Sequence, residues 1–239
     1  MSDIILETQD LTKHYGGVHA LTGANFTLRC KIVFRHAFGV ETFIHHPQRV
    51  RQFENPMDAR DAGIETVFQT LALADDLNVP DNLFLGREIF KIRLGPFSIL
   101  DYKAMREATI AGLEKTAVKI PNINNTIRNM SGGQRQCVAI ARTATFHSKL
   151  TIMDEPTAAL GVQETAQVEN IIRTLKEAGE PLILISHNMR QVMDLCDRIV
   201  VFRRGRMVAN LAKGDTDGQD VVAYITGAKT QPEYNFEVS

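Results

Sequence analysis

Residues 130–161 constrain the fold of this chain more than any other stretch. They begin with Met130-Ser131-Gly132-Gly133-Gln134 and end with the apolar run Leu150–Met153 followed by Asp154, Glu155 and Pro156. Ser131-Gly132-Gly133 opens a helical pattern with free backbone N–H groups, which favours an anion such as a terminal phosphate. Because ligands bind at the carboxyl ends of strands in open α/β sheets, Asp154 is expected to hold Mg²⁺ and Glu155 to accept a proton from an attacking water.

Taken together, these residues resemble an ABC-transporter nucleotide-binding subunit. Met130–Gln134 resembles the family's signature, Leu150–Glu155 its Walker B strand and Thr157–Gly161 its D-loop. Their order and spacing carry the resemblance, because a lone Ser-Gly-Gly-Gln is typical of a flexible loop and a lone Asp-Glu-Pro of a solvated strand end. The resemblance implies an α/β, P-loop-NTPase-like ABC ATPase core with N-terminal antiparallel strands and a helical subdomain.

Composition limits the alternatives. The chain has 239 residues, 44% of them hydrophobic, and a net charge of −1. It can therefore bury a full core, and it has no basic excess that would indicate nucleic-acid binding. No apolar run reaches the roughly 18 residues of a spanning helix and the N-terminus is acidic and polar, so a cytoplasmic location is expected. Cys30, Cys137 and Cys196 form no Cys-x-x-Cys pair and are predicted to be reduced, the last two in the core.

The N-terminal residues predict an antiparallel pair of strands. Ile4–Thr8 and Ala24–Leu28 alternate apolar and polar residues in part. Tyr15 lies between them, at the place where the resemblance implies an aromatic residue that stacks on the adenine of ATP. On its own, Tyr15 would be interpreted as a turn tyrosine beside Gly16-Gly17.

Residues 29–52 depart from the family pattern. After a strand such as Ala24–Leu28 the family continues into a buried strand and the Walker A loop, Gly-x-x-x-x-Gly-Lys-Ser/Thr, but no Gly-Lys-Ser/Thr occurs in the 239 residues. The interval from Ile32 to Gln69 is also shorter than the family pattern predicts. The region is therefore interpreted as a deletion plus an aberrant, solvated replacement segment, which would leave the core incomplete.

The missing loop bears directly on the cofactors. The resemblance implies ATP and Mg²⁺, yet the Walker A amides and lysine are the main phosphate cradle, so the isolated chain is expected to bind both poorly. The replacement segment contains potential metal ligands, namely Cys30, His36, His45 and His46, but their spacing matches no standard metal site.

Two further strand ends match the family. Ile64–Phe68 is a predicted strand before Gln69, which resembles the Q-loop glutamine that reaches Mg²⁺ and the attacking water and relays closure to the membrane partner. Residues 71–88 resemble the sugar-importer branch. Leu182–Ile185 is a predicted buried strand before His187, which resembles the switch histidine that contacts the γ-phosphate. A lone strand-end histidine or glutamine would be structural.

The expected organisation is an N-terminal part of the ATPase core (1–72), a helical subdomain ending in the signature helix (73–149), a C-terminal part of the core (150–228) and a flexible tail (229–239). Tyr102, Met105, Thr109 and Leu113 indicate one helix of the subdomain. Val168, Ile171, Ile172 and Leu175 indicate another, and residues 199–211 a hairpin that turns at Gly205.

The resemblance implies a subunit of an ATP-driven importer that couples ATP binding and hydrolysis to monosaccharide import. Its implied partners are a membrane permease subunit, a second ATP-binding subunit in a homodimer or heterodimer and, indirectly, a periplasmic sugar-binding protein, with the chain peripheral on the inner face of the membrane. Two alternatives stay open: a Walker-A-deficient pseudoenzyme that supplies Ser131–Gln134 in trans, and an inactive remnant.

Overall fold

The computed structural model describes residues 4–15, 18–29, 33–35, 44–46, 49–51, 55–146 and 148–230. The chain forms two compact units. Unit 1 comprises residues 1–65, 149–155 and 176–239, and unit 2 comprises residues 66–148 and 156–175. This division by compactness assigns residues 66–72 and 156–175 to the same unit as the helical subdomain, and the functional ranges expected from the sequence stay a prediction.

A six-stranded sheet lies mostly in unit 1, and only the second half of its strand β6 belongs to unit 2. Its strands are β3 (Val33–Arg35), β6 (Ile64–Val67), β9 (Leu150–Asp154), β10 (Leu182–Ile185), β11 (Arg198–Arg203) and β12 (Arg206–Ala212). Their order is β12-β11-β3-β10-β9-β6. Strand β10 is parallel to β9 and β3, β11 is parallel to β3, and β11 and β12 form the predicted antiparallel hairpin, with Gly205 in the turn at φ +75°. Mixed α/β architecture with a parallel centre is therefore confirmed.

The predicted N-terminal strands exist and are longer than expected. They are β1 (Ile4–Tyr15) and β2 (Val18–Arg29), paired antiparallel from Ile4 opposite Arg29 to Tyr15 opposite Val18. The register shifts at several points along the pair, which sequence alternation alone could not indicate.

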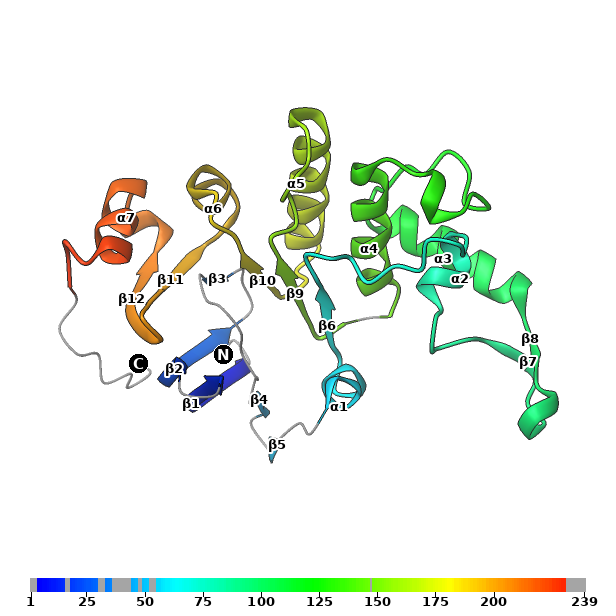
Figure 1. Ribbon diagram of the computed structural model, residues 1–239, viewed down its shortest axis with the longest axis horizontal. Coiled ribbons are helices and arrows are strands. Elements are labelled where there is room, and N and C mark those ends of the chain that lie inside the picture. Colours follow the sequence, from blue (N-terminus) through cyan, green and yellow to red (C-terminus); the bar gives the residue numbers. More distant parts are fainter. Residues whose placement is uncertain are drawn as a thin grey trace. The chain divides into compact units, whose positions relative to one another are not determined.

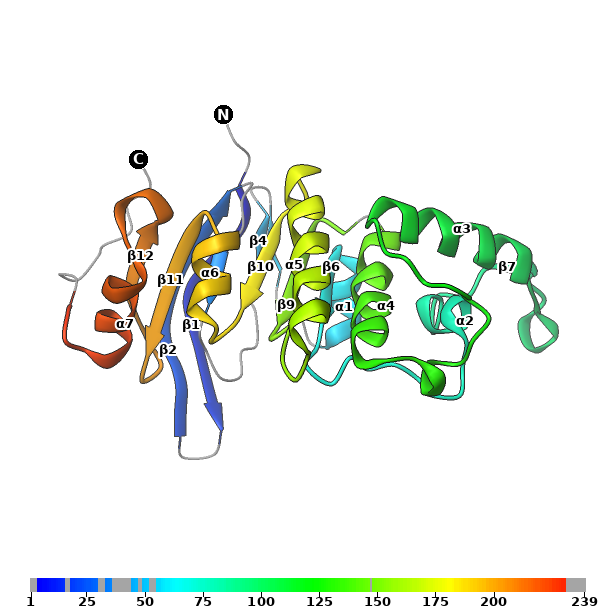
Figure 2. The same cartoon turned by 90° about the horizontal axis from the view of Figure 1, so that it is seen from above.

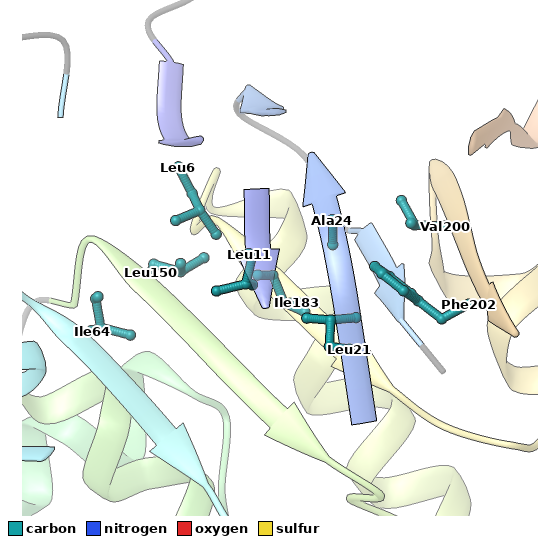
Figure 3. Packing of buried hydrophobic residues seen from close by; sticks show 9 residues of the cluster. All are labelled: Leu6, Leu11, Leu21, Ala24, Ile64, Leu150, Ile183, Val200 and Phe202. Atoms are coloured by element: carbon teal, nitrogen blue, oxygen red, sulfur yellow. The ribbon is translucent and has the colours of Figure 1, made fainter. Parts of the chain in front are cut away.

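One apolar cluster joins this hairpin to the six-stranded sheet (Figure 3). Leu6, Leu11, Leu21 and Ala24 of the hairpin are fully buried against apolar side chains from β6, β9, β10 and β11. The partners on those strands are Ile64, Leu150, Ile183, Val200 and Phe202. Since burying one Leu or Ile side chain contributes about 1.5–3 kcal/mol, this cluster is a main source of stability in unit 1.

Residues 33–35 correct one expectation. The replacement segment 29–52 was predicted to be solvated, but β3 forms parallel backbone pairs with β10 on one side and β11 on the other. The other described residues of the segment form a small antiparallel pair, β4 (Ile44–His46) with β5 (Arg49–Arg51). The described parts of residues 29–52 are thus strands, and the incompleteness of the core stays a prediction.

Three α-helices and a 3-10 turn at Lys213–Asp215 complete the described part of unit 1. The α-helices are α1 (Pro56–Asp61), α6 (Met189–Leu195) and α7 (Gly218–Thr226). Helix α1 matches the short helix expected before Gly63, which ends it at φ +93°, whereas α7 was not predicted. Figures 1 and 2 show α6 and α7 on one side of β10–β12 and the β1–β2 hairpin on the other. Within the described residues, no helix combines the length and apolar character needed to cross a membrane.

Unit 2 is mainly helical. Its elements are α2 (Val79–Leu83), α3 (Tyr102–Lys115), α4 (Gly132–Thr145), most of α5 (Val162–Glu177), and the hairpin β7 (Phe90–Ile92) and β8 (Ile99–Leu100), with short 3-10 turns at Gly95–Phe97 and Ile127–Asn129. The predicted apolar faces are buried, with one exception: Met105, Thr109 and Leu113 are buried in α3, but Tyr102, the first residue of that helix, is 64% exposed.

The core of unit 2 gathers around the start of α4. Val79, Leu83 and Phe84 pack with Met105 of α3 and with Val138 of α4, and Ile127 and Met130 fill the space before α4 begins. The rings of Phe84 and Phe146 meet edge to face with centroids 5.4 Å apart. This packing fixes the position of the α4 N-terminus within the unit.

Candidate functional site

The ends of β9 and β10 bring three of the predicted site residues together. In the parallel register Asp154 lies opposite Ile185, and the Glu155 N–H donates to the Ile185 carbonyl at 2.8 Å. The residues that follow the two strands therefore leave the sheet side by side. His187 Nδ1 lies 2.8 Å from Glu155 Oε1, which is hydrogen-bonding distance between the ring and the carboxylate.

The electrostatics of this strand-end site set Asp154 apart. Burial, and then the neighbouring Glu155 charge, raise the pKa of the Asp154 carboxyl above its ordinary value. Glu155 has φ +47°, a left-handed conformation that a non-glycine residue adopts at a cost of roughly 1–3 kcal/mol. Two adjacent carboxylates and a left-handed non-glycine residue both lower stability, so the requirements of folding do not explain them. Such features are common at functional sites.

The donor set fits a magnesium ion better than a transition metal. Hard carboxylate oxygen suits Mg²⁺, which is usually held by one or two carboxylates together with substrate phosphates and water. In the described part of the chain, no group of three or more His, Cys, Asp or Glu side chains could hold a metal ion. A cation at Asp154 would therefore need phosphate or water to complete its coordination, as Mg²⁺ bound with a nucleotide does.

The N-terminus of α4 carries the residues from Ser131 to Gln134. Ser131 Oγ accepts from the Gln134 N–H at 3.2 Å, and the Ser131 N–H donates to Gln134 Oε1 at 3.0 Å. This reciprocal pair is a capping box, which satisfies two backbone donors at the start of the helix. The same four residues that resemble a ligand-binding motif thus have a local folding role.

Glu164 of α5 packs against this turn. A Cβ on Gly133 would lie 2.7 Å from Glu164 Cγ, whereas a Cβ on Gly132 would meet Leu160 Cδ2 at an ordinary 3.6 Å. The Glu164 carboxylate accepts from the Gly161 N–H at 3.0 Å, just before α5 begins. Gly133 is therefore required for close packing between the starts of α4 and α5.

The loop after Gln69 is bound to the region around α4 by three arginines. Arg142 donates to the carbonyls of Leu71 and Ala72 at 3.2 and 2.9 Å, and these two residues have φ +61° and +47°. Arg128 pairs with Asp76 at 2.6 Å, and Arg135 lies 3.7 Å from Asp75. Gln69 itself is exposed, two residues after β6 ends.

The structure brings together Asp154, Glu155 and His187 in unit 1, and Ser131, Gly132, Gly133 and Gln134 in unit 2 with Gln69 on a loop of the same unit. Tyr15 is the last residue of β1. Most of the stretch where the phosphate cradle was expected, residues 36–43, lies outside the described residues, as do Cys30 and His36. Sequence reasoning missed Glu164 and Arg142; the signal for Glu164 was an acid three residues after Gly161, the spacing of a helix cap.

Two of the three cysteines follow the prediction. Cys137 and Cys196 are buried free thiols. Burial, the largest influence in both cases, raises the pKa of Cys137 to about 11 and that of Cys196 to about 12. Both are core residues rather than reactive ones.

Comparison with known proteins identifies the family. Residues 41–158 match the ABC transporter family model. Over 249 aligned positions, the chain is 42% identical to the fructose import ATP-binding protein of Rhizobium meliloti. The alignment covers 95% of this chain and 96% of that protein. It is 37% identical to the xylose/arabinose import ATP-binding protein of Sulfolobus acidocaldarius, over 95% of each chain. The chain belongs to the family of ABC-transporter ATP-binding subunits.

Solved structures agree on the fold. An ATP-binding cassette determined without nucleotide superposes with a TM-score of 0.72 at 19% identity, covering 92% of this chain and 95% of that one. A part of the cbiONQ ABC transporter complex from Clostridium perfringens gives a TM-score of 0.70 at 20% identity, covering 92% and 91%. The ABC ATPase fold expected from the sequence is thereby confirmed.

Family membership also sets the partners. Import ATP-binding subunits of ABC transporters bind ATP, usually with Mg²⁺, dimerise, and work with a membrane permease and a substrate-binding protein. They are cytoplasmic and associate with the permease at the membrane, and this chain shares that location as a member of the family.

Proposed function

We propose that the chain occupies the ATP-binding position of a monosaccharide importer. The two relatives that match it over nearly their whole length are import proteins for fructose and for xylose/arabinose. A ribose import ATP-binding protein of Lactococcus lactis is 36% identical, and the chain covers 46% of it. Residues 71–88, which resemble the sugar-importer branch, support the same substrate class.

The observation that carries this proposal is the strand-end site. Asp154 is assigned to Mg²⁺, and Glu155 is assigned as the general base because its carboxylate is held 2.8 Å from the His187 ring in a half-buried position. The exposed His187 is assigned to the γ-phosphate. Bound Mg²⁺ would supply charge neutralisation on the phosphates, while these side chains orient and deprotonate the attacking water.

The remaining assignments follow the family pattern. Gln69 is proposed to sense Mg²⁺ and the attacking water, and its loop is supported by Arg142 of α4. Tyr15, at the end of β1, is proposed to stack on adenine. Ser131–Gln134 is proposed to be the signature, which would contact the ATP bound by a second subunit with N–H groups at the start of α4.

A second function is favoured by what the sequence lacks. No Gly-Lys-Ser/Thr occurs in the 239 residues, and the match to the family model begins only at residue 41. The alignment with the fructose importer runs over 249 positions, more than the chain has residues, so that relative carries residues that this chain lacks. These observations support a degenerate Walker A and a subunit that supplies its signature in trans to an intact partner.

The energetic cost of such a loss is large. A charge-assisted hydrogen bond contributes roughly 1.5–3 kcal/mol, so losing three forfeits about 4–9 kcal/mol, or about three to six decades of affinity. We therefore expect weak ATP binding by the isolated chain. Micromolar binding in a calorimetric titration with Mg²⁺ would exclude the trans-only function and leave the ordinary ATPase.

An ATPase assay distinguishes the two functions. We expect no turnover by the chain alone and at most one working site when it is mixed with an intact homologous subunit. Glu155→Gln should leave the mixed activity unchanged, because the intact partner supplies the working base, whereas Ser131→Arg should abolish it. Turnover by the isolated chain that disappears in Glu155→Gln would overturn the trans mechanism.

The remnant alternative has its own test. A reading frame disrupted near residue 29, or absence of any intact paralogue in the neighbouring genes, would favour an inactive product. Restored sugar uptake in a strain that lacks the chain, after the chain is supplied together with its permease and partner, would exclude it.

A further inference from the structure

The hairpin β7–β8 projects from the helices of unit 2. Phe90 pairs with Leu100 and Ile92 with Ile99, and the turn between the strands contains the 3-10 segment Gly95–Phe97. Figures 1 and 2 show the hairpin extending beyond α2 and α3. Neither the predicted nucleotide site nor the signature uses this element.

Its apolar side chains become more exposed toward the tip. Phe90 and Leu100, at the base, are half-buried. Ile92 is 45% exposed and its cross-strand partner Ile99 is 55% exposed. At the turn, Leu94 is 65% exposed and Phe97 is 80% exposed. A group of large apolar side chains that points into water marks an interaction surface, and a hairpin this short gains little stability by itself.

The charge of the hairpin points to the kind of partner. Residues 89–100 contain two basic residues, Lys91 and Arg93, and no acidic one. Both side chains are exposed, and the Arg93 guanidinium lies 5.1 Å from the centroid of the Phe90 ring at the base. Apolar residues at a tip with cations beside them complement the boundary between anionic headgroups and acyl chains.

We propose that the β7–β8 hairpin inserts its tip into the anionic membrane surface beside the permease. Leu94 and Phe97 enter the acyl boundary, and Lys91 and Arg93 bind lipid phosphates. The complementarity between a cationic, acid-free hairpin and an anionic bilayer favours lipid over a protein surface, where acidic residues would be needed to pair both cations. Membrane contact would also orient the subunit before it meets the permease.

Vesicle flotation with the full chain tests this directly. We expect binding to protein-free phosphatidylcholine vesicles that contain phosphatidylglycerol, and much weaker binding to phosphatidylcholine alone. The double variant Leu94→Ser/Phe97→Ser should lower the partition coefficient at least about tenfold. The double variant Lys91→Glu/Arg93→Glu should lower it at least about fivefold, and high salt should reproduce that loss.

Two matched controls share the chemistry of these changes but lie elsewhere in unit 2. Ile110→Ser alters an apolar side chain of α3 that is 40% exposed, and Lys119→Glu reverses an exposed charge outside the hairpin. Both should bind vesicles as the wild type does. Thermal melting of every variant checks that the fold is retained.

A fluorescence measurement gives a second readout that does not depend on loss of binding. The chain contains no tryptophan, so Phe97→Trp introduces a single fluorophore at the tip. We expect its emission to shift to the blue on anionic vesicles and to be quenched by lipids brominated in the acyl chain.

Three results would overturn the proposal. The first is binding only to vesicles that contain the permease, which would assign the hairpin to a protein partner. The second is equal vesicle binding by the wild type and the Leu94→Ser/Phe97→Ser variant, which would assign binding to basic residues elsewhere, such as those at 29–51. The third is failure of the wild type to bind anionic vesicles at all. None of these outcomes depends on ATP binding, so they are separate from the tests of the proposed function.

Discussion

The strand-end site of unit 1 and the α4 N-terminus of unit 2 resemble family motifs equally well, but folding explains them differently. At the α4 N-terminus the polar groups of Ser131 and Gln134 satisfy each other, and Gly133 is small because Glu164 packs against it. At the strand-end site Asp154 has a raised pKa and Glu155 a strained backbone. The first can be explained by local stability, whereas the second costs stability and points more directly to function.

The reactivity of the two buried thiols reports separately on the packing of each unit. Cys137 lies one turn after Gly133 in unit 2, and Cys196 follows α6 in unit 1. Because their pKa values are raised from 9.0 to about 11 and about 12, thiolate is scarce in the folded state at pH 8. We expect a thiol-alkylating reagent to label Cys137 and Cys196 in the native chain at least about a hundredfold more slowly than in the urea-unfolded chain. Mass spectrometry of the two peptides measures each rate. Rapid labelling of either native thiol would contradict the packing of its unit.

Gly133→Ala should be the most damaging small substitution in the α4 turn. The new Cβ would meet Glu164 Cβ at 2.9 Å and Cγ at 2.7 Å, so we expect a loss of about 1–2 kcal/mol in urea unfolding. Gly132→Ala is the matched control, because its Cβ has room and alanine favours a helix by about 1 kcal/mol. Faster labelling of Cys137, but not of Cys196, should accompany Gly133→Ala. Equal stability of the two variants would show that packing does not require glycine here.

Ser131→Ala should lower the free energy of unfolding by about 1 kcal/mol, because it removes the side-chain acceptor of the capping box. Ser131→Asp retains an N-cap acceptor and should recover most of that loss. By contrast, His187→Ala changes a side chain that is 74% exposed, and its effect on stability should stay within about 0.5 kcal/mol. If His187→Ala destabilised the chain more than Ser131→Ala, the contrast between the two regions would be reversed.

Asp154→Asn should raise the melting temperature slightly at neutral pH. The folded-state pKa of Asp154 is higher than its ordinary value of 3.8, so proton binding favours the folded state. That contribution is fully present below pH 3.8 and is lost as the pH rises through the folded-state pKa, which leaves the ionised carboxylate unfavourable at neutral pH. Asp215→Asn, at an exposed acid, is the control, and scanning calorimetry at pH 4 and pH 7 should show the gain only at the higher value. An unchanged or lower melting temperature at pH 7 would argue against an unfavourable ionised Asp154 carboxylate in the folded state.

Much of the fold was predictable because its signals are local. The apolar runs 150–153 and 182–185 and the periodic residues of α4 and α5 each gave the observed element. Helix α7 and the β7–β8 hairpin were missed. Phe90–Leu94 does alternate apolar and polar residues, but β7 and β8 are only three and two residues long, too short for a distinct strand signal. The contacts of Arg142 with residues 71 and 72 link positions 70 or more residues apart, and single-sequence patterns carry no such information.

Strand β3 has a consequence for the solution behaviour of the chain. Its three residues lie between β10 and β11, so they hydrogen-bond on both sides. Without them, β10 and β11 would each become an edge strand with unpaired N–H and C=O groups, and β10 and the central residues Ile199–Phe202 of β11 are apolar. Such edges recruit other chains. The short strand therefore protects the protein from aggregation, and damage to residues 33–35 should first appear as insoluble material during expression.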